Sequence, residues 1–120
     1  MLPVTGFAMA HVLLVVPDSD LRRSLDFALR ADGHTVTWRD GLDGAPVAAR
    51  FDCTILDDLA VGQNPKQGQS FCRTLHPVIL LADTPDHELS AVAFRTVLKP
   101  LLGPSLSAAL GDALAAHLTT

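Results

Sequence analysis

Short, mostly apolar runs alternate along the chain with amphipathic segments. Three of these runs cover residues 12–16, 53–57 and 78–82. A run of this length between polar residues is typical of a strand buried on both faces. The shorter patterns of residues 34–38, where polar and apolar positions alternate, and of residues 96–98 predict two further strands.

Helical segments are predicted between the strands. The first follows the capping side chains of Asp18 and Asp20 and ends at Gly33. The last begins at Pro104 and Ser105 and carries leucine and alanine at helical spacing. The remaining patterns predict three short helices over residues 45–50, 69–75 and 84–94, and a polar loop over residues 58–68.

The order of these elements predicts the fold class. Five strand–helix units in succession predict an α/β protein with a doubly wound (βα)5 sheet of five parallel strands, covered by helices on both faces. In such sheets, sites form where the strands end at their carboxyl side. The third predicted strand ends in Asp57 and Asp58, so the sequence places two carboxylates at that edge.

Composition and charge narrow the classes of function. The chain has 120 residues, of which 48% are hydrophobic, and this suits one domain with a real core. Its net charge is −4 and its basic residues are scattered, so we expect no nucleic-acid binding by this domain alone. No stretch reaches the ~20 apolar residues of a membrane span. We expect a cytoplasmic domain over residues 11–118, with residues 1–10 as an N-terminal extension and no membrane partner.

Few residues suggest covalent or metal chemistry. Cys53 and Cys72 do not have the spacing of metal ligands, and two reduced thiols are the preferred interpretation. The turn after the first strand has no glycine-rich phosphate loop, and the chain has no G-x-S-x-G motif. We therefore expect that the chain is not an enzyme and needs no cofactor.

Six segments along the chain stand in an order known from one family. They are Asp20-Leu21-Arg22, Gly33-His34-Thr35-Val36, Asp52 with Asp57, Gly68 with Cys72-Arg73, Pro77-Val78-Ile79, and Val97-Leu98-Lys99-Pro100. Together they resemble the receiver domain of two-component response regulators, a CheY-like, flavodoxin-like fold. The resemblance covers residues 11–118.

The resemblance implies a role in bacterial two-component signal transduction, in a phosphorelay or in transcription regulation. It implies that Asp57 is at the phosphoacceptor position and that Lys99 contacts the phosphate. It also implies a cis peptide bond between Lys99 and Pro100. The segment between Ala82 and Lys99 is about one helical turn shorter than is usual in the family, so a stunted fourth helix is expected beside the short third one.

The sequence departs from the family at most other site positions. Without gaps, Val16 and Pro17 fall where the family has its acidic magnesium-binding pair. Ala82 stands at the position of the Ser/Thr that follows the phosphate, and Thr96 at that of the switching aromatic residue. These degenerate positions leave Asp57 and Asp18 as weak candidate magnesium ligands, and Asp18 is better explained as a helix cap.

Three functions remain open from the sequence. The preferred one is an atypical receiver that acts as a protein-interaction or dimerisation module and is phosphorylated weakly or not at all. The second is a conventional magnesium-dependent receiver that is phosphorylated on Asp57, and the third is a flavodoxin-like domain that binds a small ligand. The expected partners are a protein, a linked output domain or a second copy. They would bind the face of the fourth helix, fifth strand and last helix, at residues 88–98 and 106–118.

Overall fold

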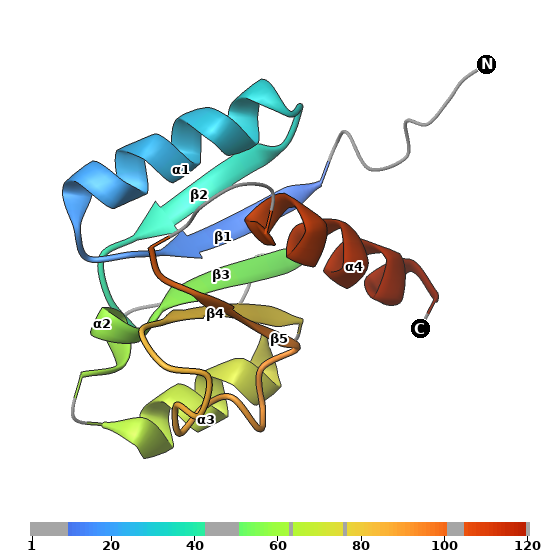
Figure 1. The fold of residues 1–120 in the computed structure, drawn as a ribbon. Helices are drawn as coiled ribbons and strands as arrows, with labels where there is room; N and C mark the ends of the chain where they lie inside the picture. Colours follow the sequence, from blue (N-terminus) through green and yellow to red (C-terminus); the bar gives the residue numbers. More distant parts are fainter. Residues whose placement is uncertain (1–9, 43–50, 63, 76, 101–104, 120) are drawn as a thin grey trace.

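The computed structural model describes residues 10–42, 51–62, 64–75, 77–100 and 105–119. They form a sheet of five parallel strands in the order β2-β1-β3-β4-β5 (Figure 1). This arrangement confirms the predicted α/β fold class. The strands are β1 (His11–Val15), β2 (Thr35–Arg39), β3 (Cys53–Asp57), β4 (Val78–Ala82) and β5 (Arg95–Leu98).

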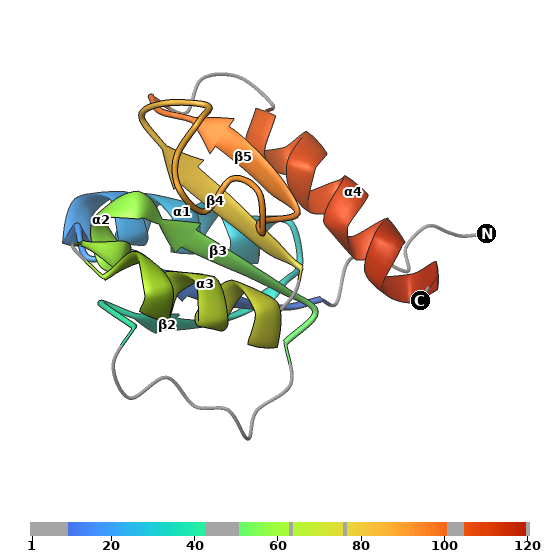
Figure 2. The same cartoon turned by 90° about the horizontal axis from the view of Figure 1, so that it is seen from below.

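Helices cover both faces of the sheet. Figure 2 shows α3 and α4 on opposite sides of the strands. Every residue of β3 and β4 is buried between these layers, as the apolar runs predict. The helices are α1 (Ser19–Ala31), α2 (Asp58–Val61), α3 (Pro65–Thr74) and α4 (Ser105–Thr119). None of the helices in the described part of the chain is long and apolar enough to cross a membrane.

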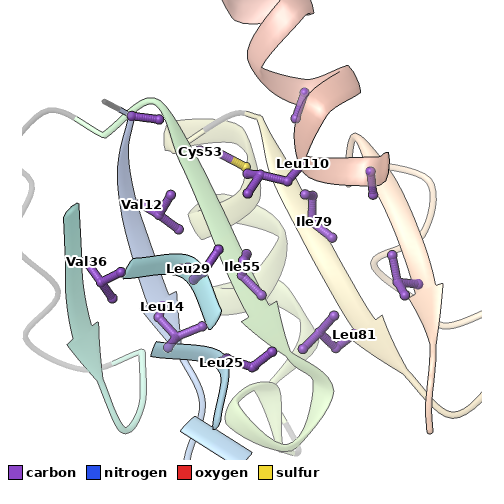
Figure 3. Packing of buried hydrophobic residues seen from close by; sticks show 14 of the residues in the cluster. Val12, Leu14, Leu25, Leu29, Val36, Cys53, Ile55, Ile79, Leu81 and Leu110 are labelled. Atoms are coloured by element: carbon purple, nitrogen blue, oxygen red, sulfur yellow. The ribbon is translucent and has the colours of Figure 1, made fainter. Parts of the chain in front are cut away.

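Each face of the sheet carries its own hydrophobic core. On one face, α1 and α4 pack against alternate residues of the central strands, among them Leu14, Ile55 and Ile79 (Figure 3). On the other face, α2 and α3 pack against the residues between them, such as Leu56 and Leu80. The period-two alternation of a strand therefore divides the apolar side chains between two layers.

The segment between β3 and β4 differs from the predicted loop. Residues 58–68 contain α2 and the start of α3, and of the described residues only Gly62 and Asn64 lie between these helices. Asn64 caps α3 by accepting a hydrogen bond from the amide of Gln67, and Pro65 occupies the first turn of the helix. The segment is rich in polar residues and glycine and was therefore predicted to be a loop, although Asn64 and Pro65 form an ordinary helix start.

The predicted helix over residues 84–94 is wrong, because all of residues 83–94 are described and form turns instead. The carbonyl of Leu89 accepts from the amides of Val92 and Ala93, and the amide of Leu89 donates to His87 Nδ1. The Leu89 side chain is fully buried against α3, where a Cβ on Gly68 would lie 2.9 Å from its Cδ1. The buried side chain of Leu89 thus makes the apolar contact with α3 that the predicted helix would have made. The short helix predicted over residues 45–50 lies outside the described residues.

Candidate functional site

Two carboxylates and one ammonium group meet at the carboxyl edge of the sheet. Asp57 is the last residue of β3, Asp58 is the first of α2, and Lys99 directly follows β5. Lys99 Nζ donates to Asp57 Oδ1 at 2.7 Å and to Asp58 Oδ1 at 2.6 Å. We call these three residues the carboxylate–lysine cluster. Figure 1 shows the ends of β3 and β5 and the short α2 at this edge.

The backbone explains how Lys99 reaches the two aspartates. Because β4 lies between β3 and β5, the lysine side chain has to cross the end of β4. The amide of Lys99 donates to the carbonyl of Ala82 at 2.9 Å, which extends the pairing of β4 and β5 by one bond. Ala82 is fully buried there. The Lys99–Pro100 peptide bond is cis, as the resemblance implies.

The pKa values of the cluster move in different directions. Burial raises the pKa of Asp57, and the neighbouring Asp58 adds to this effect although Lys99 opposes it. Partial burial acts in the same direction on Asp58, but hydrogen bonds with Lys99 and Asp57 outweigh it and lower its pKa. Burial acts to lower the pKa of Lys99, but its bonds to both carboxylates raise it. The fold therefore disfavours the charged form of Asp57 and favours the charged forms of Asp58 and Lys99.

Most of the carboxylate oxygens in the cluster are already engaged. The second oxygen of Asp58, Oδ2, accepts from the amide of Asp83 at 3.2 Å. The second oxygen of Asp57 is buried, and no group in the described part of the chain donates a hydrogen bond to it. The cluster thus presents one carboxylate oxygen that is not already bound.

After β1, Val16 and Pro17 occupy the positions of the family's acidic pair, and they offer only main-chain oxygens. Val16 and Pro17 direct their carbonyls to the guanidinium of Arg22, whose Nη1 donates to them at 2.8 and 3.3 Å. Asp18 is the N-cap of α1, and its Oδ1 accepts from the amide of Asp20 at 2.9 Å. The structure therefore puts a cation beside the β1 carbonyls and uses Asp18 in a cap.

The remaining predicted position, Thr96, lies on β5. Its hydroxyl donates to Ser90 Oγ at 3.1 Å, and this bond joins the strand to the turns of residues 83–94. Thr96 is separated from the carboxylate–lysine cluster, since Lys99 lies three residues further along the chain. The structure brings together Asp57, Asp58 and Lys99 but leaves Thr96 in a separate hydrogen bond.

Comparison with solved structures gives the fold a name. A response-regulator receiver domain from Clostridium thermocellum superposes with a TM-score of 0.76 at 19% identity, over 92% of this chain and 98% of that one. A two-component response regulator from Clostridium difficile gives 0.75 at 16%, over 88% and 96%. A receiver protein from Burkholderia phymatum gives 0.62 at 25%, over 85% and 95%.

The chain has the fold of a receiver domain. No family model matches the sequence, and no curated protein matches it either. At these levels of identity the similarity concerns the arrangement of strands and helices, while the site has to be judged from its own residues.

The residues at the edge of this receiver fold do not fit a magnesium ion. Mg²⁺ needs near-octahedral oxygen ligands. Within the described ranges, no three Asp, Glu, His or Cys side chains converge on one point. Three of the four oxygens of Asp57 and Asp58 already accept hydrogen bonds, two of them from the Lys99 ammonium. A divalent cation would have to displace that ammonium and recruit ligands from residues that have no side-chain oxygen.

A second group of interacting side chains was not foreseen from the sequence. Trp38 lies on β2, and half of its surface is exposed. The guanidinium of Arg22 lies 4.0 Å from the centre of its ring, so α1 and β2 are joined by a cation–π contact. The signal in the sequence was a lone Trp on an alternating edge strand, which does not reveal its partner.

Proposed function

We propose that this chain is a receiver-fold regulatory module in signal transduction that acts through protein contacts and does not use transfer of phosphate to Asp57. The observation that carries this proposal is the double contact of Lys99. Its single positive charge is shared by two carboxylates at 2.7 and 2.6 Å. An incoming phosphoryl group would meet two anions and one cation that is already occupied.

Charge neutralisation decides whether phosphoryl transfer proceeds. The protein contributes mainly positioning and positive charge to this reaction. The loss of one strong electrostatic stabiliser typically costs ~2.7–4 kcal/mol in a transition state. Here Val16 and Pro17 have no carboxylate to hold a metal, and the Lys99 ammonium is already shared by two carboxylates. These features favour a site that is slow or silent as a phosphoacceptor.

Two further positions support a module that does not switch in the usual way. The resemblance places a hydroxyl at the position of Ala82 and a rotating aromatic ring at that of Thr96. Alanine has no hydroxyl to follow a phosphoryl oxygen, and threonine has no ring. The Thr96 hydroxyl is already bonded to Ser90. A signal that arose at Asp57 would therefore lack the element that transmits it.

The surface of β5 and α4 is the best candidate for the partner contact. β5 is an edge strand of the sheet, and edge strands offer unpaired backbone groups to another chain. Leu98 is exposed on this strand, with 46% of its surface accessible. Arg95 of β5 and Asp112 of α4 form a salt bridge, so the strand and the helix are joined on this face. A second copy, a protein partner or a linked output domain are the occupants we propose for this face.

The first experiment tests the chemistry. The full chain is incubated with a small phosphodonor such as acetyl phosphate and with magnesium, beside a conventional receiver, and both are followed by intact mass spectrometry. We expect a phosphoryl adduct on the conventional receiver and none on this chain. An adduct that appears on the wild type and disappears in Asp57→Asn would refute the proposal.

That outcome would support the second candidate, a conventional phosphoacceptor. One observation favours it, namely that Asp57 is buried at the strand end and directly bonded to Lys99. Calorimetry with Mg²⁺ separates the two candidates further. A conventional site binds the ion with a heat that Asp57→Asn removes, whereas the interaction module gives no heat.

The second experiment tests the proposed contact surface of β5 and α4. Light scattering after size exclusion measures whether the chain self-associates, and Leu98→Ser is compared with Leu59→Ser. Both leucines are exposed, but Leu59 belongs to α2 and not to the proposed face of β5 and α4. We expect Leu98→Ser to weaken self-association and Leu59→Ser to leave it unchanged. A chain that is monomeric at all concentrations contradicts the homodimer and leaves a different protein as the partner.

A further inference from the structure

A cleft with unused hydrogen-bond donors runs between α1 and β2, on a different part of the molecule from the carboxylate–lysine cluster. Its cavity has a volume of about 190 Å³ and is lined by Ser19, Arg22, Arg23, Asp26 and Trp38. We call these five residues the arginine–tryptophan cleft. Nothing in the proposed function uses them.

The cleft is preorganised by main-chain contacts. The Nη1 of Arg22 donates to the carbonyls of Val16 and Pro17, and the guanidinium stacks on the Trp38 ring at 4.0 Å. The described residues offer no acceptor for its other nitrogens, Nε and Nη2. Arg22 is therefore fixed in place, while its Nε and Nη2 groups remain available as donors. Because the side chain is already ordered, less conformational entropy is lost when a ligand binds.

The charge in the cleft is positive on balance. Asp26 is the one acidic residue in its lining, and its carboxylate is paired with Arg30 at 2.7 Å. Arg23 is exposed and forms no ion pair with any described residue. An adjoining groove of about 610 Å³ shares Arg23 and is also lined by Asp20, Ser24 and Phe27. Two arginines thus face the cleft with one acid that is already neutralised.

We propose that the arginine–tryptophan cleft binds a phosphorylated aromatic small molecule, of which a nucleoside monophosphate is the simplest example. Arginine guanidinium groups match phosphate oxygens in geometry and charge. The cavity is smaller than the ~300 Å³ of typical ligand pockets, so it accommodates a phosphate-sized group and not a whole nucleotide. The aromatic base lies outside this cavity and stacks on the exposed part of Trp38.

Trp38 also provides the measurement. It is the only Trp in the chain, and the chain has no Tyr, so the indole emission reports on this cleft alone. The full chain is titrated with AMP, with adenosine and with inorganic phosphate, and calorimetry is run in parallel. We expect saturable quenching of Trp38 by AMP. Adenosine and phosphate bind at least about tenfold more weakly, because each lacks one of the two contacts.

A pair of matched variants locates the site. Arg23→Gln removes an exposed cation from the cleft, and Arg73→Gln removes an exposed cation from α3 on the other side of the sheet. We expect Arg23→Gln to weaken AMP binding about 10-fold or more, as for a lost charge-assisted hydrogen bond, and Arg73→Gln to leave it unchanged. Circular dichroism confirms that both variants are folded.

Three results would overturn the proposal. The first is the absence of saturable quenching and heat with AMP. The second is equal binding of AMP and inorganic phosphate, which would reduce the cleft to an anion site without a role for the ring. The third is equal AMP affinity in the wild type and in Arg23→Gln. None of these results bears on phosphorylation of Asp57, so the two proposals fail independently.

Discussion

The carboxylate–lysine cluster and the arginine–tryptophan cleft satisfy their charges in opposite ways. In the cluster, one ammonium is bonded to two carboxylates, and Asp57 is fully buried. In the cleft, the Arg22 guanidinium is held by carbonyls and an aromatic ring, and no carboxylate of the described residues binds it. The first group uses its one positive charge internally, while the second leaves positive charge and an aromatic surface open to solvent.

This difference shows why position in a fold is a poor guide to activity. The receiver fold brings the ends of β3 and β5 together whatever residues stand there. In this chain, that edge holds an internal ion cluster, which suits a structural role. The free donors occur on the flank of the sheet, where the fold by itself predicts no site.

The largest expected effect comes from removing the central charge of the cluster. Lys99→Met leaves the buried Asp57 carboxylate without its cation, and loss of one partner of a buried pair costs about 3–5 kcal/mol in unfolding free energy. Urea denaturation at neutral pH measures this loss. Lys66→Met, on the exposed side of α3, is the control and should be indistinguishable from the wild type. A loss below about 1 kcal/mol in Lys99→Met would mean that the cluster does not stabilise the fold.

The pH dependence of stability should show the signature of the same cluster. The folded-state pKa of Lys99 is raised above its ordinary value of 10.5, so its contribution is fully present below pH 10.5 and is lost as the pH rises through the raised pKa. The pKa of Asp58 is lowered from 3.8, so its contribution is present above pH 3.8 and is lost as the pH falls through the lowered pKa.

Asp57 has the opposite sign, because its raised pKa means that ionisation destabilises the fold as the pH rises above 3.8. Denaturation midpoints across the acid and alkaline ranges test all three groups. In Lys99→Met the alkaline loss should vanish, and an unchanged alkaline loss would assign it to another residue.

Substitution of the two aspartates should have intermediate effects on stability, and the two costs should differ. The fold favours the charged form of Asp58 and disfavours that of Asp57. Asp58→Asn removes a charge-assisted hydrogen bond with Lys99 and should cost about 1.5–3 kcal/mol. Asp57→Asn removes a buried charge and should cost less, within about 1 kcal/mol. Denaturant unfolding of both variants gives the order, and the reverse order would show that Asp57 carries the main ion pair.

The smallest effects are expected in the cleft. Arg22→Gln removes the stacking on Trp38 and the bonds to two carbonyls, and should cost about 1–2 kcal/mol. It should also shift the Trp38 emission to longer wavelength, as the ring becomes more solvated. Arg23→Gln, one residue further along, should change neither stability nor emission. Equal behaviour of the two variants would contradict the description of Arg22 as the fixed side of the cleft.

The sequence was sufficient for the centre of the fold and for part of the site. β3 and β4 begin and end where predicted, because a strand buried on both faces needs an unbroken apolar run. The resemblance pointed to Asp57 and Lys99, and they meet because parallel strands end at one edge. Apolar runs were enough for the two strands, and the resemblance was needed for the two residues.

The rest depends on contacts between distant residues. The sequence Thr84-Pro85-Asp86 has the composition of a helix start, yet the burial of Leu89 beside Gly68 holds this segment in turns. In the same way, the stacking of Arg22 on Trp38 joins two elements whose separate patterns do not reveal it. Tertiary packing decided both cases, and a single sequence without an alignment carries no signal for it.

The two cysteines lie in different hydrophobic cores, Cys53 between the sheet and α4 and Cys72 within α3 on the opposite face. Burial raises the pKa of Cys53 to about 12 and that of Cys72 to about 11, so both thiols are unreactive while the fold is intact. Alkylation at either position would thus require its own side of the molecule to open first. The chain carries an independent internal reporter of local unfolding in each layer, without any engineered label.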